Sequence, residues 1–393
     1  MNKLHQDKNF YIITLLTLMA IIGGTIYNPA LPTIAKFFHI SSDRVSLVST
    51  LFQFPGAIVT PIFGVLADTF GRKQVLVPSL LLFALGGALS SFAPNFRSLI
   101  EWRFLQGIGT ASLESLQLTI ISDLYTGKKL TSVMGFVASL NGISSAIFPL
   151  LGGVLASFSW RFPFLTALFA IPVAIMVLTT LKLPRTEHNV QNFQIKNYLR
   201  NTWSSINNRQ VLGLLFAVMS LFMLQVGACL TYIPIFAGNQ LGASELVIGI
   251  ILTSLSLSLA LVASQLQLLM RHFSQIQLIK ISFILSSLGL FIIPTIHNVW
   301  LLLIPIFLLG AAQGMAFPST QASLAMLSSQ ESRAGFMGIN STIQSWGQTL
   351  GPLLGSIIDA IWGIQAVFYA SAVFSLGSFV VFNTLLTTKK GQT

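Results

Sequence analysis

The chain consists of long apolar segments separated by short polar breaks, and this pattern more than any other limits what it can fold into. Only 8% of its 393 residues are charged. A soluble domain carries about 25% charged residues, because water must solvate its surface. A chain this poor in charge cannot cover itself in water, so most of its surface is expected to face lipid.

The lengths of the apolar segments predict an all-α membrane protein with about twelve transmembrane helices, since one helix crosses the bilayer with about 20 apolar residues. Twelve spans leave about 33 residues each, so the loops are short and no separate soluble domain fits. The first span has no small-residue cleavage site after a short apolar core and is expected to be retained. The expected spans are residues 10–32, 45–66, 75–93, 98–122, 131–156, 163–181, 211–236, 246–268, 276–296, 300–321, 332–361 and 366–387.

A polar stretch close to the middle divides the chain into two halves. It contains Pro184, five basic residues and several Asn and Gln side chains. We therefore expect an N-terminal six-helix bundle at residues 1–181, a cytoplasmic linker at residues 182–209 and a C-terminal six-helix bundle at residues 210–393.

The two halves also resemble each other in sequence. The segment Ser144–Gly153 (SSAIFPLLGG) matches Gly347–Ser356 (GQTLGPLLGS) 203 positions later. Gln106-Gly107 matches Gln313-Gly314 at a separation of 207 positions. Two matches in the same order at nearly one offset indicate an internal duplication, as in many secondary transporters, so the two bundles are expected to be pseudo-symmetric.

Most basic residues are expected on one side of the membrane. Those on the majority side are Lys3, Lys8, Arg72, Lys73, Lys128, Lys129, Lys182, Arg185, Lys196, Arg200, Arg209, Arg271, Lys280, Arg333, Lys389 and Lys390. On the other side lie Lys36, Arg44, Arg97 and Arg161. Lys and Arg concentrate in cytoplasmic loops, so both termini are expected in the cytoplasm, at a bacterial inner or plasma membrane. This orientation accounts for the net charge of +11, so the charge does not require a nucleic acid as partner.

The segment GVLADTFGRK at residues 64–73 follows the second predicted span. Its glycines allow close helix approach and a sharp turn, and Asp68 can cap a neighbouring helix. Arg72 can pair with an acid such as Asp123. The segment resembles the signature between spans two and three of the major facilitator superfamily. A positively charged turn with a helix cap is the simpler interpretation of the same residues.

In that family this cluster is regarded as a latch that helps to hold the outward-facing state. The resemblance implies this role for Gly64, Asp68, Gly71, Arg72, Lys73 and Asp123. It covers essentially the whole chain, and the twelve-span drug/proton antiporters match best. Members of the family usually work as monomers.

The fourth predicted span carries a polar stripe and contains RFLQGIG at residues 103–109, which resembles the family's fourth-span motif. The stripe residues are spaced by three or four positions and share one helical face: Arg103, Gly107, Thr110, Glu114 and Gln117. Lipid cannot satisfy such a stripe, so it is expected to face a water-filled cavity or another polar surface. A buried arginine is costly and marks a functional site by default.

Glu114 is the acid that the predicted spans place deepest in the bilayer. A carboxyl group in apolar surroundings can hold a proton at neutral pH and exchange it for a substrate. Arg103 lies about 16 Å away along the helix axis, too far for direct pairing, but it can bias a proton or an anion nearer the outer mouth. Glu114 and Arg103 are therefore the predicted proton-coupling residues. Alternatively, Glu114 pairs with polar groups of another helix and only fixes packing.

The fifth span contains a Pro-Leu-Leu-Gly-Gly run where the family's exporters have a glycine-rich antiport motif. The chain departs from that motif, because Phe148 stands where glycine is expected and Ser144 replaces the leading glycine. The fuller form lies in span eleven. Kinked, closely packed helices are an equally good interpretation. The predicted hinge and packing residues are Pro149, Gly152, Gly153, Gly347, Gly351, Pro352 and Gly355.

In the family's architecture, spans 1, 4, 7 and 10 line the central cavity. Besides the coupling residues, the predicted cavity residues are Tyr27, Asn28, Gln117, Gln225, Tyr232, Gln313 and Gln321. A cavity with one acid and mostly apolar walls suits amphipathic or cationic compounds better than sugars or phosphates.

No enzyme or metal site is expected. The five histidines are scattered near loops without metal-ligand spacing. The chain has no phosphate-binding glycine-rich loop followed by Lys-Ser/Thr, which argues against an ATP-driven pump. We expect no cofactor; the energy source would be a proton gradient.

The sequence thus predicts a proton-coupled secondary transporter that exports drugs or other amphipathic small molecules by alternating access. The first alternative is a dedicated exporter of one metabolite, such as a metallophore, a sugar or an amino acid. A minor alternative from another class is a non-transporting membrane sensor. It would need an added soluble domain or a long tail, and the sequence offers neither.

Overall fold

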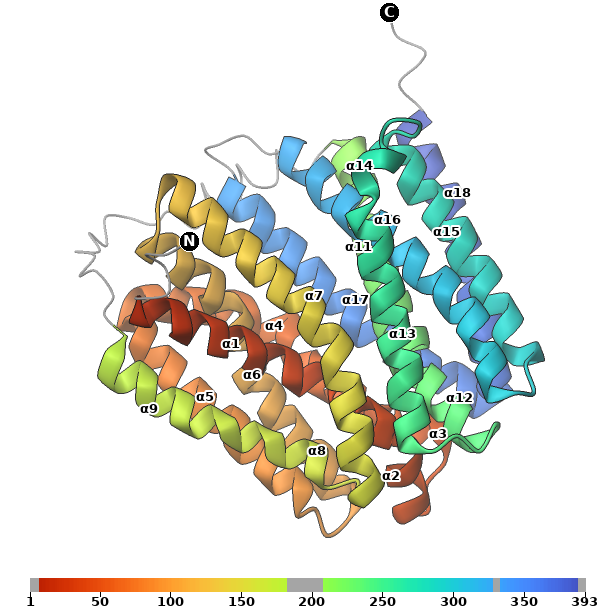
Figure 1. The fold of residues 1–393 in the computed structure, drawn as a ribbon, viewed down its shortest axis with the longest axis horizontal. Helices are drawn as coiled ribbons and strands as arrows, with labels where there is room; N and C mark the ends of the chain where they lie inside the picture. The colour runs from red at the N-terminus through yellow and green to blue at the C-terminus, as the bar shows by residue number, and fades with distance from the viewer. Residues whose placement is uncertain (1–6, 182–207, 328–332, 388–393) are drawn as a thin grey trace, which may run out of the picture. The chain divides into compact units, whose positions relative to one another are not determined.

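The computed structural model describes residues 7–181, 208–327 and 333–387, and no strand occurs within these ranges (Figure 1). The predicted linker lies mostly outside them. The chain forms two compact units. Unit 1 comprises Met1–Ser41, Leu47–Asn189 and Ser244–Thr253, and unit 2 comprises Ser42–Ser46, Val190–Ala243 and Ser254–Thr393.

Unit 1 holds the first six spans. Its elements are α1 (Lys8–Thr25), η1 (Asn28–Ala30), α2 (Leu31–Phe37), α4 (Leu47–Phe70), α5 (Arg72–Ser91), α6 (Phe96–Leu124), α7 (Gly127–Phe158), α8 (Phe162–Leu165), η2 (Thr166–Phe169) and α9 (Ala170–Thr180). Helix α1 lies between α7 and α9 (Figure 1). The Tyr125 hydroxyl, just after α6, donates a hydrogen bond of 2.7 Å to the Asp7 carboxylate, which caps the start of α1. Burial, together with this hydrogen bond, raises the pKa of Tyr125, so the phenol remains a donor.

Unit 2 holds the remaining spans and one short segment from the first half. Its elements are α3 (Ser42–Val45), α11 (Arg209–Phe222), the π-helix η3 (Met223–Tyr232), α12 (Ile233–Asn239), the later part of α13 (Glu245–Ser264), α14 (Leu266–Leu269), α15 (Gln275–Ile292), η4 (Ile293–Thr295), η5 (Val299–Leu302), α16 (Leu303–Leu327), α17 (Arg333–Trp362) and α18 (Ile364–Thr387). Helix α15 lies beside α16 and α18 (Figure 1).

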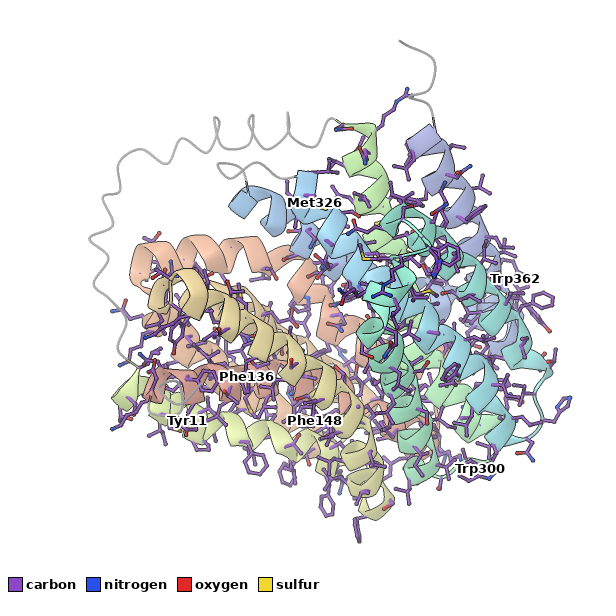
Figure 2. The ribbon with its side chains drawn as sticks, turned by 45° about the horizontal axis from the view of Figure 1, so that its top comes forward. Tyr11, Phe136, Phe148, Trp300, Met326 and Trp362 are labelled. Carbon is purple, nitrogen blue, oxygen red and sulfur yellow. The ribbon has the colours of Figure 1, made fainter. Side chains whose placement is uncertain are left out.

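The helices are long enough for the predicted spans. Nine helical segments of the described residues are long and apolar enough to cross a membrane. Three further helices, α4, α6 and α17, contain 24, 29 and 30 residues and complete the predicted twelve. Large apolar side chains such as Trp300 (52% exposed) and Trp362 (70% exposed) project from the helices, as Figure 2 shows. A surface of this kind belongs in lipid.

One close contact between two helices occurs in both units. The residues that form it are separated by the same number of positions as the Gln-Gly repeat in the sequence. In unit 1, a Cβ atom on Gly107 of α6 would collide with the carbonyl oxygen of Phe52 in α4. In unit 2, a Cβ atom on Gly314 of α16 would lie 2.5 Å from the carbonyl oxygen of Leu259 in α13. Both members of the second pair follow those of the first by 207 positions. The same close approach therefore recurs in each half, as a duplication requires.

The units differ from the predicted halves by two short exchanges. Ser42–Ser46, at the start of the second span, belongs to unit 2, because α3 packs against α17. Ser244–Thr253, at the start of the eighth span, belongs to unit 1, where the Thr253 hydroxyl donates 2.7 Å to the Ala146 carbonyl of α7. Sequence boundaries alone could not locate these exchanges.

Candidate functional site

The guanidinium group of Arg103 is enclosed by aromatic rings in unit 1. Its Cζ atom lies 4.0 Å from the ring centroid of Tyr27 and 4.0 Å from that of Phe52. The side chain is only 1% exposed, and no described carboxylate forms an ion pair with it. Ring faces attract a cation most strongly where water is excluded, so they replace the missing counter-ion.

Arg103 also makes hydrogen bonds to three elements. It donates 2.6 Å to Gln106 Oε1 on its own helix, 3.3 Å to the Gly23 carbonyl of α1 and 3.4 Å to the Val48 carbonyl of α4. The polar surface opposite Arg103 is thus the backbone of α1 and α4, and the side chain joins three helices.

Glu114 lies three turns further along α6, and its surroundings differ from those of Arg103. Its side chain is exposed, and no described residue makes a hydrogen bond or ion pair with it. The other members of the predicted stripe are buried: Thr110 donates 3.1 Å to the Gln106 carbonyl, and Gln117 donates to the Thr17 hydroxyl of α1. Glu114 is therefore the stripe residue whose charged group stays available for a ligand.

The predicted latch residues lie together at one end of unit 1. Gly71 begins α5 with a φ of 94°, a left-handed conformation that favours glycine. Arg72 forms an ion pair with Asp123 at the end of α6, and the Lys73 ammonium donates 2.5 Å to the Leu178 carbonyl of α9. The sequence suggested the Arg72–Asp123 pair, and the structure contains it. The latch function stays a prediction, and the surroundings of Gly64 and the side chain of Asp68 lie outside the described part.

We expect Asp123→Asn to lower the maximal transport rate by about fivefold while leaving the half-saturation concentration nearly unchanged. The reason is that the substitution destabilises one conformational state and removes no contact with the substrate. Rates in reconstituted vesicles measure this. The double variant Arg72→Gln/Asp123→Asn should be no slower than the single one, since both remove the same pair. An unchanged rate in Asp123→Asn would contradict a conformational role.

The predicted cavity residues of unit 1 are packed against protein. Tyr27 is 2% exposed and donates 3.0 Å to the Ser49 hydroxyl. Asn28 is 1% exposed, and its amide donates 3.5 Å to the Gly24 carbonyl. In this structure both side chains therefore hold η1 in place.

Unit 2 contains several buried polar atoms that lack protein partners within the described chain. Gln313 donates 3.5 Å to Cys229 Sγ, but its Oε1 atom is unpaired. The Tyr232 hydroxyl is also unpaired. Gln321 accepts 3.1 Å from Asn340, whose own Oδ1 atom is unpaired. Buried polar groups need water or a ligand, so this unit offers binding capacity. The sequence-based reasoning missed Asn340.

Helix η3 carries two predicted cavity residues, half-buried Gln225 and buried Tyr232, within ten π-helical residues. π-helical turns are frequent at functional sites. Gly351 of α17 packs here, since a Cβ atom on Gly227 would lie 2.7 Å from the Gly351 carbonyl carbon. The predicted packing glycines thus bring α17 close to η3.

The other predicted packing residues also lie at helix contacts. A Cβ atom on Gly152 of α7 would collide with the Ile26 carbonyl after α1. One on Gly153 would lie 2.5 Å from the Glu245 carbonyl, and the Pro149 carbonyl faces Gly249 of α13. Gly347 and Gly355 face Met219 and the Tyr232 ring, and Pro352 is buried beside them in α17. Their hinge role stays a prediction.

Comparison with known families decides what kind of protein these two units form. The sequence profile of the Major Facilitator Superfamily matches residues 13–265 and 230–393. The chain belongs to the major facilitator superfamily. Like other superfamily members it is a multi-pass membrane transporter, and this confirms the fold predicted from the sequence.

The relatives of this superfamily protein include a multidrug resistance protein and an exporter. Multidrug resistance protein 1 of Bacillus subtilis (strain 168) is 28% identical over 381 residues, covering 95% of each chain. The bacillibactin exporter of the same organism is 34% identical over 164 residues, covering 40% of this chain and 41% of that one. A solved bacterial homologue of the human lysosomal transporter Spinster has a TM-score of 0.82 at 14% identity, over 96% of both chains, and shows the shared fold.

Within the described residues, no group of three or more His, Cys, Asp or Glu side chains could hold a metal ion.

Proposed function

We propose that the protein is a proton-coupled exporter of drugs or other amphipathic small molecules that works by alternating access. The observation that carries the proposal is the state of Glu114. It is an exposed carboxylate, without a partner in the described chain, near the middle of α6, where the other polar residues of its stripe are packed. Such a group can bind either a proton or a cationic substrate, and competition between the two couples their movement.

The similarity to multidrug resistance protein 1 along nearly the whole chain supports export of several compounds. The excess of Lys and Arg on one side supports cytoplasmic termini. We propose that the proton gradient is the energy source, with no cofactor.

The test uses vesicles with an acidic interior that contain the purified protein. The probes are lipophilic cations of permanent charge, because a pH gradient by itself cannot trap them. For one-for-one exchange of a monovalent cation, a gradient of one pH unit supports about tenfold accumulation, since one unit corresponds to about 1.4 kcal/mol. We expect accumulation of several unrelated cations that collapses when an electroneutral proton/potassium exchanger, with equal potassium on both sides, dissipates the pH gradient without creating a membrane potential. Accumulation that survives this treatment would contradict proton coupling.

A dedicated exporter of one metabolite is the second candidate function. The similarity of 164 residues to the bacillibactin exporter favours it. If the vesicles exchange a single metabolite but accumulate none of the cations, the result would favour this alternative. Failure of all exchange would favour a membrane sensor without transport.

A further inference from the structure

Lys280 of α15 is a basic residue that the proposed transport function does not use. It lies near the start of the helix, which begins at Gln275, and its ammonium group donates 2.6 Å to Asn383 Oδ1 near the end of α18. Both side chains are half-buried, and the two helices lie side by side in unit 2 (Figure 1). The bond holds the ammonium group in place against the neighbouring helix.

No described carboxylate compensates the charge of Lys280. Its partner is an amide oxygen, which carries no negative charge, and the ion pairs found among the described residues both lie in unit 1. An ammonium group has three donor protons, so two remain after the bond to Asn383. A charge that is fixed in position and partly removed from water is stabilised by a nearby anion. The described residues supply none.

The end of unit 2 that carries Lys280 is basic. Helix α11 begins here at Arg209 and lies beside the last turns of α18, because a Cβ atom on Gly213 would approach Leu385 Cβ to 3.4 Å. Arg271 precedes the start of α15. The side chains of both arginines are exposed. Two mobile positive charges thus accompany the fixed one.

The acids of unit 2 within the described residues, Asp43 and Asp359, lie at the opposite end. Helix α16 ends near Lys280, since Ser323 donates 2.8 Å to Gln275 Oε1, and α17 starts five residues after α16. Helix α17 has 30 residues and is about 45 Å long. Asp359 lies in its last turn, and the Asp43 carbonyl accepts a hydrogen bond from Ser356 nearby. These acids are therefore too far away to pair with Lys280.

Large apolar side chains project from the same two helices further into the membrane. On α15, Ile284 and Leu288 follow Lys280 at intervals of four residues, and both are exposed. On α18, exposed Val380 precedes Asn383 by three residues. Residues three or four apart share a helix face, so each member of the hydrogen-bonded pair continues into an exposed apolar surface. A fixed cation below such a surface is complementary to an anionic lipid, with its phosphate at the ammonium group and its acyl chains along the helices.

We propose that Lys280 and Asn383 form a binding site for the headgroup of an anionic phospholipid. The Lys280 ammonium donates to the lipid phosphate, Asn383 positions the ammonium group, and the acyl chains lie along α15 and α18. Arg271 adds only a diffuse attraction. The site faces the membrane side on which α18 ends, which is cytoplasmic in the proposed orientation. It depends neither on Glu114 nor on the identity of the exported compound.

The test is native mass spectrometry of the purified full chain with equal amounts of phosphatidylglycerol and phosphatidylcholine that have identical acyl chains. We expect the wild type to retain phosphatidylglycerol in preference. Lys280→Gln should lower this preference about fivefold, the factor that corresponds to about 1 kcal/mol for a basic residue at an anionic surface. Glutamine can still donate to Asn383, so thermal unfolding in detergent without added lipid should match the wild type. Lys280→Arg keeps the charge and should keep the preference.

Two further variants separate a site from a general effect of charge. Arg271→Gln removes the same charge from an exposed side chain at the same end, where solvent and salt screen it, and should lower the preference by less than about twofold. Asn383→Leu leaves every charge in place but releases the ammonium group, so it should also lower the preference. This variant keeps the proposal testable if Lys280→Gln does not fold.

Three results would overturn the proposal. The first is a wild type that retains both lipids equally. The second is an equal loss of preference in Arg271→Gln and Lys280→Gln, which would show that diffuse charge alone attracts the lipid. The third is displacement of phosphatidylglycerol by millimolar inorganic phosphate, which would show that the groups bind a small anion and that the acyl chains contribute nothing.

Discussion

Replacing Glu114 by glutamine is expected to reduce pH-driven accumulation of lipophilic cations to the level of vesicles without protein. The substitution keeps the side-chain volume but removes the group that can alternate between proton and cation. No described residue bonds to Glu114, so its loss breaks no contact of the described structure, and expression and thermal stability should match those of the wild type. The measurement is cation accumulation in vesicles with an acidic interior.

Three comparisons make this result interpretable. Glu114→Asp keeps a carboxyl group and should retain part of the accumulation. Glu101→Gln removes an exposed acid from the start of the same helix and should accumulate like the wild type. Exchange of labelled for unlabelled cation without a pH gradient should also weaken in Glu114→Gln, because the variant lacks the carboxylate that binds the cation. Normal accumulation in Glu114→Gln would show that coupling resides elsewhere.

The sequence was sufficient for the architecture, because apolar length and positive charge are local signals. Helix ends were harder to place. The fifth span was predicted at residues 131–156, but α7 runs from Gly127 to Phe158. The second span was predicted to end at residue 66, whereas α4 continues to Phe70. Hydropathy falls at the first polar residues, while a helix continues into the headgroup region because its backbone bonds still form there.

The candidate site was only partly accessible from the sequence. The Arg72–Asp123 pair could be anticipated because both residues flank predicted spans at the same membrane side. Helical spacing predicted that Arg103, Thr110, Glu114 and Gln117 share one face. It could not show that neighbouring helices cover three of them and leave Glu114 exposed. Periodicity describes one helix, whereas burial depends on the packing of several.

The packing of the Ser42–Ser46 segment against α17 was beyond sequence reasoning altogether. The segment begins the second span, whereas α17 is the eleventh span in the other half of the chain. The Ser356 hydroxyl of α17 donates 2.8 Å to the Asp43 carbonyl, and neither composition nor spacing carries that information.

Replacing Arg103 by alanine is expected to cause the largest loss of stability of any single substitution considered for this protein. Two ring faces at 4.0 Å lose their cation, which is worth about 2 kcal/mol in a desolvated site. Gln106 Oε1 and the Gly23 carbonyl lose a donor in buried surroundings, at about 1–3 kcal/mol. Relief of the desolvation cost of the guanidinium offsets part of this. We expect a net loss of about 3 kcal/mol, seen as earlier thermal unfolding in detergent.

Two further variants separate the contributions of Arg103. Arg103→Met fills most of the volume with apolar atoms and leaves the acceptors unpaired, so it should be more stable than the alanine variant but less stable than the wild type. Arg103→Lys keeps a charge over the rings without the forked donors and should recover about half of the loss. Arg97→Ala removes an exposed arginine and should change little. If Arg103→Met unfolds at the wild-type temperature, the guanidinium does not hold α1, α4 and α6 together. If Arg103→Lys is stable but no longer accumulates cations, Arg103 acts in proton coupling as well as in packing.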